Sequence, residues 1–474
     1  MKKVLISVLI ASLPGIAMAD STQEQIAALK AQLAAMQSQL ATLQQSVQAQ
    51  QDALSPDEAA TMKQQVTNQQ MKVDALQTAA TEGPLAGLSV TGYLDPTYMY
   101  NRNANSSSFM FANHVGSYNY DNSTIGDVYL DIKKTFGVGP TAPSAEITIM
   151  PNRGNGETLL TNNNGTTGNN IINTAVINFP LSDSTALMAG LMPSFGGYEV
   201  QQSNQMETLT HNLMYDFSDP GSYVGVGASW SVGNWATKLL IGNEQNHTSG
   251  YTATNGSGTQ SNRSPTVTGR FDYTWSSAID LGGSFNVGRQ TLPASVAGPG
   301  FGYQGTSNSA FSQYAFTELD YTYNLDDVIV NAEADYGQQK DAAFNGGNAA
   351  WYGASLLAHE KWNTEMLGRM GATLRYDYLN DSRNGGGGGG IVLGATGQDS
   401  YNGFGIDPNC ANGAQCKGAN HQSLTADLLF YPTNQLILKF EMRHDWTNQN
   451  VFLRSDGNYT DNNNIIGAQA VYSF

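Results

Sequence analysis

Charged residues at every second position form two groups in the C-terminal half of the chain, and a period of two places them on one face of β-strands. The mainly acidic group comprises Asp272, Asp280, Glu318, Asp320, Glu333 and Asp335. The mainly basic group comprises Lys361, Arg369, Arg375, Lys439 and Arg443. If the two groups face each other across water, they create a transverse field that orients dipolar solutes.

No arrangement of residues predicts catalysis or a cofactor. The six histidines form no HExxH pair, and neither a GxSxG nor a Walker A motif is present. The hexaglycine run Gly385–Gly390 lacks the Lys-Ser/Thr that phosphate binding needs, and it reads as a flexible loop. We therefore expect no enzyme, no cofactor and no bound metal. The alternative is a hydrolase site of acids or histidine at the rim of a barrel.

The two cysteines, Cys410 and Cys416, are separated by five residues. In an exported protein such a pair predicts a small disulfide within one loop. A metal pair at this spacing has no support from other ligands nearby.

The N-terminus, MKKVLISVLIASLPGIAMA, has two lysines, a short apolar stretch and small residues before Asp20. This pattern is typical of a secretory signal peptide over residues 1–19. The alternative, a membrane anchor, needs about 20 apolar residues and is therefore disfavoured. Export implies that the mature chain folds outside the cytoplasm.

Residues 20–84 are predicted to be helical. Apolar residues from Ile26 to Leu54 alternate spacings of three and four, which is typical of a coiled coil. Ser55-Pro56 starts a second helix with a capping box completed by Glu58. We expect a periplasmic stalk that joins three chains through residues 26–54, and a helical hairpin is the alternative.

From Leu85 onward the apolar period changes to two, and short links alternate with long links rich in Asn, Gly and Ser. A β-sandwich has the same period, but alternating link lengths favour a transmembrane β-barrel over residues 85–474. An even count of sixteen antiparallel strands places both barrel ends in the periplasm. The expected strands lie near 86–94, 124–136, 142–151, 169–180, 185–193, 221–232, 235–243, 265–275, 278–289, 313–324, 327–337, 351–362, 365–378, 422–431, 435–446 and 463–474.

Aromatic residues stand beside the expected turns, as in the two girdles of a membrane barrel. The chain ends on Tyr472 and Phe474, whose parity puts both rings on the outward face of the last strand. This ending resembles the C-terminal signal of Gram-negative outer-membrane proteins, which implies recognition by their assembly machinery.

Several stretches resemble a proteobacterial porin-like family known as a domain of unknown function. They are GLSVTGYLDPTYMYNR, LDIKKTFGVGP, GLMPSFGGYEVQQSNQM, the hexaglycine run and the terminal YSF. The coiled coil before a barrel looks more loosely like the trimeric dicarboxylate porins. Ser194, Phe195, Gly196 and Gly197 are similar to part of the third loop of general porins, which implies that residues 194–220 fold inward as a constriction. Ser194 stands where those porins have an acid, so the charge does not carry over.

Together these features predict an outer-membrane porin for small hydrophilic solutes. A formal net charge of −17 argues against nucleic acid as a partner. A channel selective for carboxylates or a chelated metal is one alternative, and a non-conducting adhesin or anchor is another. Acids outnumber bases at the expected inward positions, which predicts weak cation preference. The inward charges can also simply pair with one another.

Overall fold

The computed structural model describes residues 86–111, 125–137, 139–150, 171–244, 252–255, 258–262, 264–292, 310–383, 391, 393–394, 396–410 and 416–474. The expected signal peptide and coiled coil, residues 1–84, lie outside this set. None of the described residues belongs to a helix that is long and apolar enough to cross a membrane.

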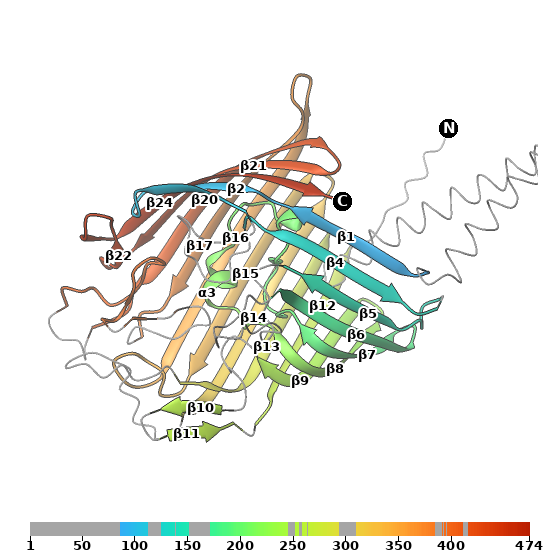
Figure 1. Cartoon of the computed structure of the whole chain (residues 1–474), viewed down its shortest axis with the longest axis horizontal. Coiled ribbons are helices and arrows are strands. Elements are labelled where there is room, and N and C mark those ends of the chain that lie inside the picture. Colours follow the sequence, from blue (N-terminus) through green and yellow to red (C-terminus); the bar gives the residue numbers. More distant parts are fainter. Residues whose placement is uncertain are drawn as a thin grey trace, which may run out of the picture.

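One antiparallel sheet of eighteen strand segments closes on itself as a barrel with sixteen strand positions. Figure 1 shows these strands arranged around a central space in which α3 (Leu213–Phe217) lies. The segments are β1 (Leu88–Leu94), β2 (Thr97–Asn101), β3 (Ser106–Met110), β4 (Val128–Thr135), β5 (Ser144–Ile149), β6 (Ile172–Ser182), β7 (Thr185–Met192), β8 (Tyr223–Val232), β9 (Trp235–Glu244), β12 (Thr266–Ser276), β13 (Ile279–Thr291), β14 (Phe311–Leu325), β15 (Val328–Gln339), β16 (Ala349–Thr364), β17 (Gly368–Asn380), β20 (Asn420–Thr433), β21 (Leu436–Thr447) and β24 (Asn462–Ser473). The predicted sixteen-stranded antiparallel barrel is confirmed.

The barrel closes between its first and last strands. Tyr93 on β1 is opposite Ser473 on β24, and β2 continues the pairing with β24. We expected the first strand to end at residue 94. This was wrong, because the strand continues after a break as a second segment, β2. Pro96 lacks the N–H that a central strand donates, yet its carbonyl accepts from Ala470 N at 3.2 Å, so the strand resumes as β2. β3 pairs with β2 in what was expected to be loop.

Three small hairpins lie in the long connections and were not predicted. They are β10–β11 (Thr252–Asn255, Gly258–Ser261), β18–β19 (Gln398–Asp399, Phe404–Gly405) and β22–β23 (Phe452–Leu453, Tyr459–Thr460). We call the end of the barrel that carries these connections the long-loop end. The opposite, short-turn end carries links such as Gly233–Asn234 between β8 and β9. Both ends of the barrel sequence lie at the short-turn end.

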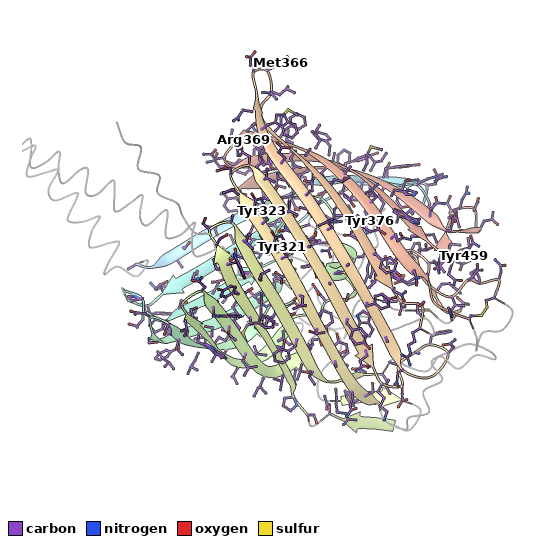
Figure 2. All side chains as sticks on the ribbon, turned by 180° about the vertical axis from the view of Figure 1, so that it is seen from behind. Tyr321, Tyr323, Met366, Arg369, Tyr376 and Tyr459 are labelled. Atoms are coloured by element: carbon purple, nitrogen blue, oxygen red, sulfur yellow. A yellow bond between two sulfur atoms is a disulfide. The ribbon has the colours of Figure 1, made fainter. Side chains whose placement is uncertain are left out.

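Outward and inward side chains alternate as a membrane barrel requires. On β14, Leu319 is 61% exposed, whereas its neighbours Glu318 and Asp320 are buried on the inner face. Figure 2 shows Tyr321 and Tyr323 toward the short-turn end, and Met366 at the tip of the β16–β17 turn. The outward face is therefore an apolar band with aromatic residues near its boundaries.

The long-loop end of the interior is apolar. Residues 342–344, Phe404 and Ile406 from the loops pack with Trp351 of β16 in one buried cluster. Leu213, Met214 and Phe217 of α3 belong to the same cluster. Packed side chains therefore occupy this part of the lumen.

Candidate functional site

Residues 193–222, here called the inner segment, connect β7 to β8 and fold into the barrel. Phe195, Leu209 and Leu213 of the inner segment are all buried. Asn212 caps α3 by accepting from Tyr215 N at 2.7 Å. Gly197 has φ +71°, and a Cβ there would lie 2.9 Å from Glu333 Oε1, so glycine allows the segment to approach the wall.

Three cations of the basic group bind backbone carbonyls of the inner segment. Lys439 Nζ donates to the carbonyl oxygens of residues 203, 206 and 208 at 2.7, 2.9 and 2.7 Å. Arg375 donates to Thr210 O and His211 O, each at 2.7 Å. Arg443 Nη1 also donates to His211 O, at 2.9 Å. These donors satisfy carbonyls that have no partner in regular secondary structure.

Acids of the same wall bind the amides of the inner segment. Glu441 Oε2 accepts from Leu209 N and Thr210 N, both at 2.9 Å. Asp427 Oδ1 accepts from Leu209 N at 3.0 Å. The wall thus supplies both donors and acceptors to one stretch of irregular backbone, which fixes its register.

Glu207 of the inner segment meets two bases on β16. Its carboxylate lies 2.8 Å from Lys361 Nζ and 3.2 Å from His359 Nε2. Burial raises the pKa of Glu207, but the charge of Lys361 and the nearness of His359 outweigh burial, so this pKa lies below its usual range. The carboxylate is therefore held in its charged form.

The acidic group surrounds Arg270 on β12. Arg270 lies 2.8 Å from Asp272 and 2.8 Å from Asp320, and its Nη1 donates to Phe195 O at 3.2 Å. Glu333 Oε2 accepts from Asn212 Nδ2 at 3.1 Å, which joins β15 to the inner segment. Burial, and then the charge of Asp335, raise the pKa of Asp219 well above its usual range.

The structure brings five of the eleven predicted charges into contact with the inner segment instead of leaving them across open water: Lys361, Arg375, Lys439, Arg443 and Glu333. Arg375, Lys439 and Arg443 are fully buried against it, so the space that the sequence left to solutes is filled there. Arg369 lies apart at the short-turn rim, where its partner is Asp327 and its side chain is 42% exposed. The inner segment also contributes acids that were not predicted as site residues, among them Glu199 and Glu207. Both follow Ser194-Phe195-Gly196-Gly197 within ten residues.

The short-turn side of the inner segment is more open and polar. Lys133 on β4 pairs with Glu146 on β5 at 2.9 Å, and each side chain keeps 22% of its surface exposed. Lys361 is exposed to a similar extent, and Asp280 is half-buried near the β12–β13 turn. Lys361 and Asp280 therefore remain in contact with water, as do the predicted lining residues Arg369 and Asp272.

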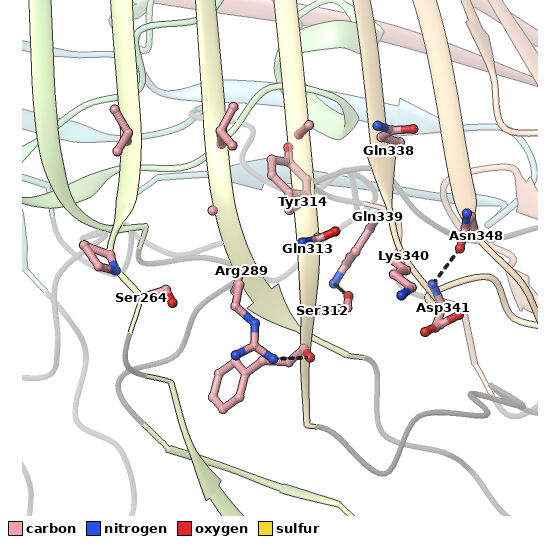
Figure 3. Close-up of a pocket in the computed structure, with 16 residues that line it drawn as sticks. Ser264, Arg289, Ser312, Gln313, Tyr314, Gln338, Gln339, Lys340, Asp341 and Asn348 are labelled. Carbon is pink, nitrogen blue, oxygen red and sulfur yellow. Dashed lines mark hydrogen bonds between the residues drawn. The ribbon is translucent and has the colours of Figure 1, made fainter.

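A cavity of about 1030 Å³ lies toward the long-loop end of β12–β15, as Figure 3 shows. Its lining includes Val267, Val287, Arg289, Ala315 and Gln338, which all have the outward parity of their strands. Tyr314 and Gln339, which have the inward parity of their strands, line the same cavity, so it lies at the barrel wall.

The predicted cysteine and C-terminal residues have clear places. Cys410 and Cys416 form a disulfide, and both pack against the apolar cluster at the long-loop end. Tyr472 and Phe474 point outward, each about half exposed. Phe474 exchanges two backbone hydrogen bonds of 3.0 Å with Gly92 of β1, so the last residue helps to close the barrel.

A closed barrel with an apolar outer band and a segment folded into its lumen defines a transmembrane β-barrel of the porin-like class. The chain belongs to the family described as Protein of unknown function (DUF3138), whose profile matches residues 1–55 and 50–474. The predicted resemblance to a porin-like family of unknown function is thereby confirmed. A search of curated proteins finds no match.

The chain is similar, at low sequence identity, to several solved structures of outer-membrane proteins. In-vitro folded OmpT, an outer membrane protein of Vibrio cholerae, is 7% identical with a TM-score of 0.44, covering 82% of this chain and 97% of that chain. An anion-selective porin from Comamonas acidovorans is 10% identical with a TM-score of 0.46, covering 82% and 99%. The outer membrane channel DcaP of Acinetobacter baumannii is 12% identical with a TM-score of 0.47, covering 82% and 97%.

Proposed function

We propose that the protein is an outer-membrane porin through which small hydrophilic solutes diffuse, with the inner segment as its constriction. The observation that carries this proposal is the position of residues 193–222 inside the barrel, held by side chains of β12, β15, β17 and β21. A segment so placed narrows the lumen and sets the size and charge of what can pass. The polar residues at the short-turn side support an aqueous approach to it.

The test is conductance of the purified protein in planar bilayers, followed by liposome swelling with sugars, amino acids and dicarboxylates. We expect discrete channels and swelling rates that fall with solute size and do not saturate. Saturation by one solute class would favour a selective channel for carboxylates or a chelated metal. A folded protein without conductance would contradict the proposal and favour an adhesin or structural anchor.

The proposal includes a cellular arrangement. The barrel lies in the outer membrane with its short turns toward the periplasm, where the stalk of residues 20–84 joins three chains through residues 26–54. The outer-membrane assembly machinery recognises Tyr472 and Phe474. Apolar heptads without charge pairing at their flanks support self-association.

Deletion of residues 20–84 tests this arrangement. The truncated protein should still insert and conduct, because the barrel buries its own backbone groups. Native mass spectrometry in mild detergent should show trimers of the mature chain and weaker association after the deletion. Monomers alone in the mature protein would contradict the stalk proposal without affecting the proposed conductance.

A further inference from the structure

Three carboxylates converge where the inner segment meets β15. Asp219 comes from the inner segment, and Glu333 and Asp335 come from the inward face of β15. One oxygen from each carboxylate lies within 4.8 Å of the others. The three side chains come from residues that are 5%, 4% and 5% exposed, so water screens their charges little.

Several oxygens of this cluster have no donor. Neither carboxylate oxygen of Asp219 accepts a hydrogen bond from a described residue. The same is true of Oε1 of Glu333. Across the strand pair, Glu318 is directly opposite Asp335, is buried, and also has no hydrogen-bond donor on either oxygen. Buried polar atoms are normally satisfied, so unpaired oxygens on several neighbouring acids indicate a ligand.

The local cation does not balance these charges. Arg270 lies 2.8 Å from Asp320 and 2.8 Å from Asp272, and 3.7 Å from Glu318. Its charge is therefore shared among three other acids. An uncompensated group of buried carboxylates is costly unless a cation joins it or some of its members take a proton.

The ligand type and its burial favour one kind of cation. Three carboxylate oxygens within 4.8 Å of one another can share one divalent ion. Mg²⁺ demands near-ideal octahedral geometry and gives up its waters reluctantly, so a buried group of protein carboxylates suits the more flexible coordination of Ca²⁺. Carboxylate oxygens alone form a hard ligand set, which suits Ca²⁺ and disfavours Zn²⁺ and Cu²⁺.

We propose that Asp219, Glu333 and Asp335 form a buried calcium site that fastens the inner segment to β15. The remaining ligands would be water or backbone carbonyls, since Ca²⁺ takes about 6–8 oxygens. Because Asp219 stands four residues before β8, the ion holds the end of the inner segment that leads back to the wall. The site does not depend on whether the barrel conducts.

The test uses the full mature protein in mild detergent, stripped with EDTA and dialysed against CaCl₂ from micromolar to millimolar. Bound calcium is counted by mass spectrometry of the metal. We expect one Ca²⁺ per chain, displaced only by a large excess of Mg²⁺. The variant Asp219→Asn plus Asp335→Asn should bind at least about tenfold more weakly, since even outer-shell changes cost that much. Asp326→Asn plus Asp456→Asn, two exposed acids, is the matched control and should bind like wild type.

A second readout covers a variant that fails to fold. Calcium should raise the melting temperature of wild type over its value in EDTA, and the single change Glu333→Gln should reduce this shift. Wild type that stays calcium-free, or a folded Asp219 variant with unchanged affinity, would overturn the site. Calcium binding by a protein without conductance would leave the site standing and contradict only the proposed porin function.

Discussion

Arg375 Nη1 on β17 lies 3.0 Å from Glu199 Oε1 on the inner segment, and both residues are buried. The same guanidinium contacts Asp377 Oδ2 through Nε at 3.1 Å. One cation on the wall therefore compensates an acid of its own strand and an acid of the inner segment. Loss of this cation would leave two buried carboxylates without a charge partner.

Arg375→Met tests how firmly the inner segment is held. Removing one partner of a buried ion pair typically costs about 3–5 kcal/mol, so the variant should unfold at lower urea concentration. Its channels should be larger or noisier, because the Thr210 carbonyl loses its donor and the His211 carbonyl keeps only Arg443. Arg369→Met at the exposed rim is the control. Bilayer recordings in which both variants behave like wild type would contradict the constriction.

Charge preference tests the acidic group. We expect weak cation preference at low salt, measured as a reversal potential in a KCl gradient with chelator present. The preference should vanish near 1 M salt, where the Debye length is about 3 Å. Asp320→Asn plus Glu333→Gln should shift the potential toward anions. Anion preference in wild type, or no shift in the double variant, would refute the assignment.

We expect the side-chain ring of Phe474 to matter more for assembly of the barrel than for the backbone hydrogen bonds that close it. Phe474→Ala keeps the backbone pair with Gly92 but loses a ring whose transfer from water is worth about 1.5–3 kcal/mol. The fraction of heat-modifiable barrel in outer membranes should fall. Phe440→Ala, another outward ring, is the control. Equal yields from both variants would argue against a terminal signal.

The disulfide should stabilise its loop and not the barrel. Its ring closes over a sequence separation of six, so loop closure contributes at most about 2–3 kcal/mol. Cys410→Ser plus Cys416→Ser should retain heat-modifiable folding and gain protease cleavage sites near residue 410. An unfolded double variant would mean that the bridge supports the barrel itself.

Acid should loosen a contact between two long loops. Partial burial raises the pKa of Asp407, but hydrogen bonds from Asn409 N at 2.8 Å and Asn450 Nδ2 at 3.1 Å outweigh it, so this pKa lies below its usual range. A lowered folded pKa gives stability that is present above the unfolded value, about 3.9, and is lost as pH falls through the folded value.

Hydrogen exchange near residues 407 and 450 reports this contact. Protection should be constant at neutral pH and fall below about pH 4, where the carboxyl takes a proton. Asp407→Asn should lower protection at neutral pH to the level that wild type shows in acid, and it should remove the pH dependence. Asp456→Asn, at an exposed acid elsewhere in the connection that carries Asn450, should leave it unchanged. A pH dependence that persists in Asp407→Asn would assign the effect to another group.

The sequence by itself determined the barrel wall. Lipid and lumen select opposite side chains at every second residue, so Leu319 and Glu318 reveal their faces without a structure. Link lengths gave the sixteen strand positions, and the parity of Phe474 gave its outward face. These are local signals, and they could be read for each strand separately. The sequence did not show that the first strand resumes after Pro96. A proline lacks the N–H donor of a central strand, but its carbonyl can still accept from Ala470 N.

Only the tertiary structure decided what the inward charges contact. Leu209 N donates to Glu441 across a sequence separation of 232, and the Glu333–Asn212 bond spans 121. A periodic sequence pattern cannot predict such a contact, because the inner segment is irregular. Its partners also lie on strands that are far away in the sequence. The sequence could therefore place Lys439 and Arg375 on the inner face, while the folded loop decided that they bind backbone carbonyls instead of facing water.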